Sequence, residues 1–125
     1  MKEEPRKWIR KADKDLSTAG FALQTVDGPL PVTTALHCQL AAENYLKAFL
    51  SEQGIPFLDS YRLSSLFEAC KPVDNSFDGL LPVIEQLHRY SIASSYPKSG
   101  DSLGFREEAI ASTKRVRDFV LGKLT

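Results

Sequence analysis

Hydrophobic and polar positions alternate with the period of an α-helix over most of the chain. Apolar residues recur every three or four positions in four long segments. We predict these as helices at about 5–26, 32–53, 80–93 and 103–124. No run alternates with the two-residue period of a β-strand. The pattern therefore predicts an all-α fold, an antiparallel up-and-down four-helix bundle with a short extra helix, in a single domain that spans residues 1–125.

Breaker residues mark where these helices end. The segment DGPLP at 27–31 ends the first helix, and Gly54 ends the second. Ser60 is a candidate N-cap for the short extra helix, which reaches Cys70 and ends before Pro72. We expect this helix to cover one end of the bundle.

The second predicted helix carries polar residues within its hydrophobic face. At about 100° per residue, an arc of roughly 60° on either side of Gln39 holds Val32, Ala35, Leu36, Ala42, Leu46 and Leu50. Glu43 lies in the same arc, and Lys47 lies one turn further on, at its rim. A buried carboxylate without a partner costs several kcal/mol. Glu43 is therefore either paired or faces an opening.

The fourth predicted helix offers a partner for this carboxylate. Its inward arc holds Leu80, Ile84, Leu87 and Ser91, and His88 projects only about 40° from Ile84. A contact between Glu43 and His88, with Gln39 nearby, would satisfy several polar groups together. Two interpretations follow: a network that fixes the register of the bundle, or a polar cleft between the second and fourth helices that binds a ligand or partner.

Arg89 projects about 140° from Ile84 and is expected to point away from this core. Tyr90 follows it directly, and Tyr96 follows the helix. An arginine beside tyrosines can hold phosphates and stack on bases, or anchor a protein interface, or be ordinary surface.

The opposite side of the second helix has small or polar residues at His37, Ala41, Asn44 and Ala48. Such a stripe lets another helix approach closely. The first helix, the last helix and a second subunit all remain candidates.

Composition excludes several function classes. Sixteen basic residues balance sixteen acidic ones, so no net charge attracts the chain to nucleic acid or membrane, although residues 1–15 hold six basic and four acidic groups. Cys38 and Cys70 have no metal-binding spacing and are expected to be reduced, buried thiols. No stretch resembles a signal peptide or a membrane span. We expect a cytoplasmic protein without metal or cofactor.

Catalytic motifs are also missing. The chain has two histidines, no glycine-rich phosphate loop, no GxSxG elbow and no HExxH pair. Cys38 and His37 are adjacent, so on a helix they point about 100° apart and form no dyad. No catalytic residue is assigned.

Two segments together resemble a known family. KWIRKADKDLSTAGFAL, at 7–23, contains the pattern W-x3-A-x2-DL, and ALHCQLAAENYLKAFLSEQG, at 35–54, carries Gln39, Glu43 and Lys47. With YRLSSLFEAC and SIASSYPKSGDS in the expected order, these resemble the HEPN domains of bacteria and archaea. The resemblance implies a four-helix bundle, usually a homodimer. It also implies a protein that occurs alone or beside a small nucleotidyltransferase encoded next to it, often as a toxin–antitoxin pair.

Some members of that family are metal-independent ribonucleases, and others are non-catalytic binding domains. The ribonucleases carry an arginine followed, after four to six residues, by a histidine. Here no histidine follows Arg89, and His88 precedes it. Two further positions differ: SYP stands at 95–97 where many relatives have RYP, and YRL stands at 61–63 where many have a histidine before the leucine.

The resemblance therefore implies a non-catalytic module that binds a nucleotide, RNA or a nucleotidyltransferase partner. A divergent metal-independent ribonuclease is the alternative. The candidate cleft residues are Gln39, Glu43, Lys47, His88, Arg89, Tyr90 and Tyr96.

Overall fold

A computed structural model describes residues 2–25, 31–95 and 102–124 of the protein. These residues form five α-helices and one 3-10 helix, with no strand among them. The elements are α1 (Glu3–Thr25), α2 (Pro31–Glu52), α3 (Leu63–Cys70), η1 (Asn75–Leu80), α4 (Leu81–Ser95) and α5 (Ser102–Leu124). The all-α prediction is confirmed.

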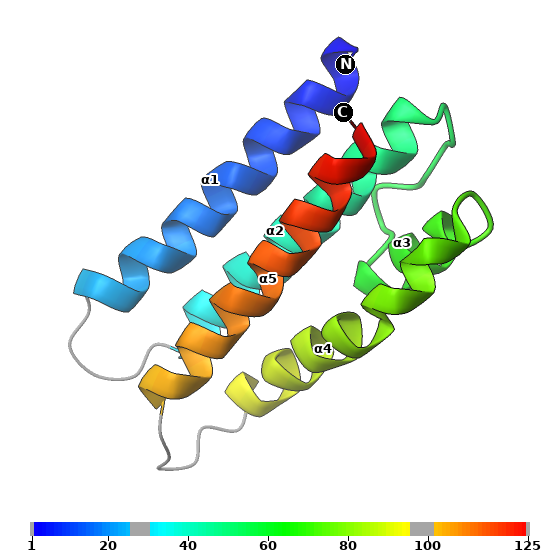
Figure 1. The fold of residues 1–125 in the computed structure, drawn as a ribbon. Coiled ribbons are helices and arrows are strands. Elements are labelled where there is room, and N and C mark those ends of the chain that lie inside the picture. Colours follow the sequence, from blue (N-terminus) through cyan, green and yellow to red (C-terminus); the bar gives the residue numbers. More distant parts are fainter. Residues whose placement is uncertain (1, 26–30, 96–101, 125) are drawn as a thin grey trace.

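The four long helices run alternately up and down, and the start of α1 lies near the end of α5 (Figure 1). The second helix is central, since it packs against α1, α4, α5 and α3. Short α3 packs against α2 and α4. The arrangement is the antiparallel bundle with an extra helix that the periodicity predicts.

Aromatic rings fill one part of the core. Phe77 of η1 lies edge-on between Phe49 of α2 and Phe119 of α5, with centroid distances of 4.6 and 4.9 Å. Edge-to-face contacts of this kind stabilise a core beyond the burial of their area. The 3-10 helix is therefore tied to the bundle, although the pattern of apolar residues did not predict it. Asp74 caps it by accepting a hydrogen bond from the Ser76 backbone N–H at 3.0 Å.

Glycine ends α2 as predicted. Gly54 has a φ of 71°, and the N–H of Ile55 donates to the carbonyl of Leu50 at 2.9 Å while the N–H of Gly54 donates to the carbonyl of Ser51 at 3.1 Å. This is the hydrogen-bond pattern of a Schellman motif, whose left-handed residue favours glycine.

Two expectations were wrong. Ser60 does not cap α3: the N-cap is Arg62, in an extended conformation, and its side chain makes no capping hydrogen bond. Leu36, placed on the inward face, is 53% exposed. The buried arc of α2 is centred near Cys38 and Phe49, about 90° from Gln39, because α2 is packed by neighbours on several sides. Gln39 consequently lies at its edge, and Leu36 lies about 150° from its centre, on the exposed side.

Candidate functional site

Glu43 binds the start of α3. Its side chain is 3% exposed, and its Oε2 accepts hydrogen bonds from the Leu63 backbone N–H at 3.1 Å and from Gln39 Nε2 at 3.2 Å. Leu63 is the first residue of α3. The backbone N–H groups in the first turn of a helix have no acceptor within that helix. The carboxylate of another helix thus supplies the cap that Arg62 lacks. A negative charge is also favourable at the positive end of the helix dipole.

The predicted contact between Glu43 and His88 does not form. No hydrogen bond or ion pair joins them in the described part of the chain, and His88 is exposed. The register of α3 against α2 gives Glu43 a backbone donor instead. The buried carboxylate therefore has the hydrogen-bond partner that the network interpretation required, but this partner is a backbone N–H and not His88.

His88 and Arg89 line a groove between α3 and α4. Its volume is about 440 Å³, and its lining is mainly apolar. The apolar residues are Leu63, Phe67, Leu81 and Ile84, and the polar ones are Ser64, Glu68, Glu85, His88 and Arg89. The two glutamates offset the charge of Arg89, so the groove has no excess of positive charge. Glu43 does not line this groove, but it binds the first residue of α3, the helix that forms one wall of the groove.

Tyr90 does not join Arg89 on this surface. Tyr90 is buried, with 8% of its surface exposed, and its hydroxyl donates to Glu108 of α5 at 3.0 Å while accepting from Gln86 at 2.5 Å. Burial and the Glu108 carboxylate raise the pKa of Tyr90. Its ring therefore packs between α4 and α5 and is not available for base stacking. Tyr96 lies outside the described residues.

Lys47 lies in a different place from His88 and Arg89. Its Nζ is 4.9 Å from the ring centroid of Trp8, on α1, and 5.9 Å from that of Phe57, in the segment after α2. The six candidate residues that the structure describes therefore do not form one cleft. They divide between the α3–α4 groove with its supporting Glu43, the core contact of Tyr90, and the surface around Trp8.

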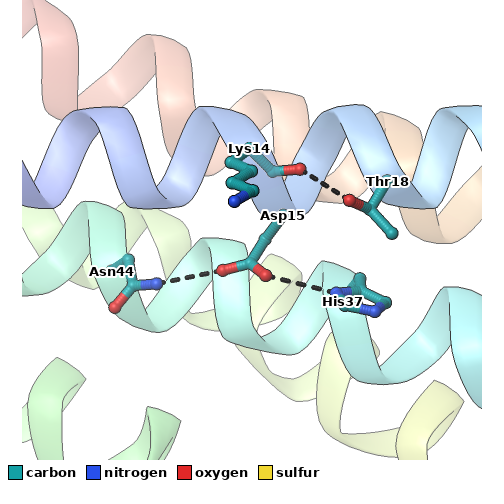
Figure 2. A network of polar contacts seen from close by, with 5 residues as sticks. All are labelled: Lys14, Asp15, Thr18, His37 and Asn44. Carbon is teal, nitrogen blue, oxygen red and sulfur yellow. Dashed lines mark hydrogen bonds and ion pairs between the residues drawn. The ribbon is translucent and has the colours of Figure 1, made fainter.

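A polar network that the sequence did not reveal lies between α1 and α2 (Figure 2). Asp15 accepts from Asn44 Nδ2 at 3.1 Å and lies 3.2 Å from His37 Nδ1. These contacts show which element packs on the stripe of small and polar residues of α2. The stripe packs against α1, and Ala41 is fully buried there. The sequence does contain one indication of this network. Asp15 lies two turns after Trp8 on the same face of α1, and it is therefore a carboxylate on an apolar face, as Glu43 is on α2. In Figure 2 the neighbouring Thr18 hydroxyl donates to the Lys14 carbonyl, at 3.0 Å.

A larger groove of about 810 Å³ runs between α1 and α5. Three of the four charged residues that line it already have partners within the chain: Asp13 accepts a hydrogen bond from Tyr45, and Arg117 Nε donates to Asp118 at 2.9 Å. Burial, followed by the Asp13 hydrogen bond, raises the pKa of Tyr45 above its ordinary value. Because these charged groups have partners within the chain, this groove has less to offer a charged ligand.

Over the part of the chain that the structure describes, neither thiol chemistry nor a metal site is indicated. Cys38 and Cys70 are both buried and unpaired, as predicted. Burial raises the pKa of the Cys38 thiol to about 11 and that of Cys70 to about 12, so both are protonated at neutral pH. Within the described residues, no cluster of three or more His, Cys, Asp or Glu side chains is arranged to hold a metal ion. None of the helices, over the same residues, is long and apolar enough to cross a membrane.

The fold and the two motif-bearing helices define a helical-bundle domain. The model of the HEPN domain family matches residues 5–123, and the chain belongs to that family. No curated protein and no solved structure matches it significantly.

Proposed function

We propose that the chain is a non-catalytic HEPN module that binds a protein partner in the α3–α4 groove. The composition of this groove carries the proposal. Its apolar floor and polar rim have the layout of a protein interface, and arginine is enriched at such interfaces. Glu68 and Glu85 on the same rim oppose the approach of a polyphosphate, so a nucleotide or RNA fits this groove less well than a protein.

The partner we propose is a small nucleotidyltransferase encoded beside this chain, in a toxin–antitoxin-type pair. Membership of the HEPN family supports this choice, since the sequence resembles the nucleotidyltransferase-associated type. We further propose that the chain is a homodimer, as members of the family usually are. The two buried free thiols support a cytoplasmic location, where cysteines stay reduced.

The positions of the two histidines support the proposal that the chain is not catalytic. A ribonuclease of this family needs a base for the ribose 2′-hydroxyl near its arginine. His37 is engaged by Asp15 between α1 and α2, and His88 is the neighbour of Arg89 on one helix, where adjacent side chains point about 100° apart. These positions give Arg89 no histidine in the order that the catalytic motif requires.

Isothermal titration calorimetry with the purified nucleotidyltransferase encoded next to this chain tests the partner. Wild type is compared with Arg89→Glu, in the groove, and with Arg115→Glu, an exposed arginine of α5 that does not line the groove. Both variants make the same charge change. We expect Arg89→Glu to weaken binding about tenfold or more, as for an interface hot spot, and Arg115→Glu to bind as wild type does.

Equal affinities for wild type and Arg89→Glu would contradict the groove, and absence of binding by wild type would contradict the partner. Light scattering of the free chain tests the dimer. A particle of 13.9 kDa at micromolar concentration would refute it.

A further inference from the structure

Three lysine ammonium groups converge on the single tryptophan of the chain. The Nζ atoms of Lys7, Lys11 and Lys47 lie 5.5, 4.7 and 4.9 Å from the centroid of Trp8. Lys7 and Lys11 come from α1 and Lys47 comes from α2, so the packing of two helices creates the cluster. Phe57 lies edge-on to Trp8 at 5.7 Å and helps to hold the ring in place.

These three charges have no anionic partner in the described part of the chain. The ion pairs found there join other residues, and Glu3, the acidic residue at the start of α1, pairs with Arg10 at 2.9 Å. Glu43, one turn before Lys47 on α2, accepts hydrogen bonds from the Leu63 backbone N–H of α3 and from Gln39.

Uncompensated charges at this spacing repel one another. Because all three lie within 5.5 Å of one centroid, any two are at most about 10 Å apart, which is one Debye length at 0.1 M salt. Attraction to the face of the ring holds the ammonium groups close to it despite this repulsion. An anion bound beside them would relieve their mutual repulsion. A further sign of incomplete satisfaction is the Trp8 indole N–H, which is buried without a hydrogen-bond partner.

We propose that Lys7, Lys11 and Lys47 form a binding site for a phosphate group, which a free nucleotide or the backbone of RNA would supply. Lysine binds phosphate as a compact point charge with three donors, and three lysines match a group that carries up to two negative charges. Lys7 and Lys11 are exposed, so the site is open to solvent. The site is separate from the α3–α4 groove. The proposal therefore does not depend on whether that groove binds a protein.

Trp8 supplies its own probe, because it is the only tryptophan and its fluorescence reports on the ring that the lysines surround. The chain is titrated with sodium pyrophosphate, with ATP and with a single-stranded RNA 12-mer, and with NaCl at matched ionic strength. The double variant Lys7→Gln/Lys11→Gln removes two exposed charges without disturbing the core. The matched control is Lys114→Gln, an exposed lysine of α5 that has no contact with Trp8.

We expect a saturable change in Trp8 fluorescence with at least one phosphate compound, and an affinity at least about fivefold lower in the double variant, with the control unchanged. A response to pyrophosphate and ATP identifies a free nucleotide as the ligand class, and a response to RNA alone identifies the polymer backbone. Salt dependence of the affinity is expected in each case. No saturable response, an equal response to NaCl, or an equal loss in Lys114→Gln would overturn the proposal.

Discussion

Removal of the Glu43 carboxylate is expected to detach the start of α3 from α2. Glu43→Ala leaves the Leu63 N–H without the acceptor that lies 3.1 Å away, and Leu63 is buried, so water cannot easily replace it. A hydrogen bond to a charged group contributes about 1.5–3 kcal/mol, and the interaction with the helix dipole adds roughly 0.3–1 kcal/mol. Removal of the carboxylate also removes the cost of its desolvation, which offsets part of this sum. We therefore expect Glu43→Ala to lower the free energy of unfolding by about 2 kcal/mol.

Glu43→Gln keeps an oxygen that can accept from Leu63 but removes the charge. The expected loss is smaller, about 1 kcal/mol, because a neutral hydrogen bond is weaker than a charge-assisted one. Urea unfolding followed by circular dichroism measures both values by linear extrapolation, with unchanged slope. Glu85→Ala, an exposed glutamate on the groove rim, is the control and should change the free energy by less than about 0.5 kcal/mol. A loss below that limit in Glu43→Ala would refute the capping role.

Three further results are expected. Asp15→Ala removes the acceptor of two half-buried side chains between α1 and α2 and should lower the unfolding free energy by about 1–2 kcal/mol in the same urea assay; an unchanged value would mean that the network is not stabilising. Cys38 and Cys70, buried thiols with raised pKa values of about 11 and 12, should react with Ellman's reagent far more slowly at pH 8 in the folded protein than in guanidinium chloride; equal rates would contradict their burial. The Lys123 ammonium, followed by Ser76, lowers the pKa of Asp74 from 3.8 to about 2, so its stabilising contribution is present above pH 4 and is lost as the pH falls towards 2. The stability gap between wild type and Asp74→Asn should close over that interval, and a gap independent of pH would contradict the ion pair.

Most of the fold follows from local patterns in the sequence. The long helices begin and end within about two residues of the positions predicted from apolar spacing and breaker residues, since both signals act over one or two turns. Gly54 is an example, because a left-handed residue at the end of a helix favours glycine whatever surrounds it. Burial of Cys38 and Cys70 was predicted for a similar reason, as a free cysteine behaves as a small apolar residue.

The polar contacts were harder to predict because their partners are distant in the sequence. That Glu43 needed a partner could be read from its place in an apolar arc, but the partner is the backbone N–H of Leu63, 20 residues away, and a backbone group leaves no mark in the sequence. Tyr90 was placed beside Arg89 by adjacency, yet consecutive residues of a helix point in different directions, and Tyr90 turns towards Glu108 of α5.

The cluster around Trp8 shows the same limit. Lys47 was one of the candidate residues, but its contact with a tryptophan 39 residues earlier could not be predicted from the sequence. Such contacts depend on how α1 and α2 pack, and the rotation of α2 about its own axis differed from the predicted one by about 90°.

Cleavage of labelled mixed RNA by the purified chain, in the presence of a chelator and beside Arg89→Ala, tests the central claim most directly. A non-catalytic HEPN module leaves the RNA intact in both samples. Loss of RNA with wild type that disappears in Arg89→Ala would contradict this account and would define a metal-independent ribonuclease that lacks the usual histidine.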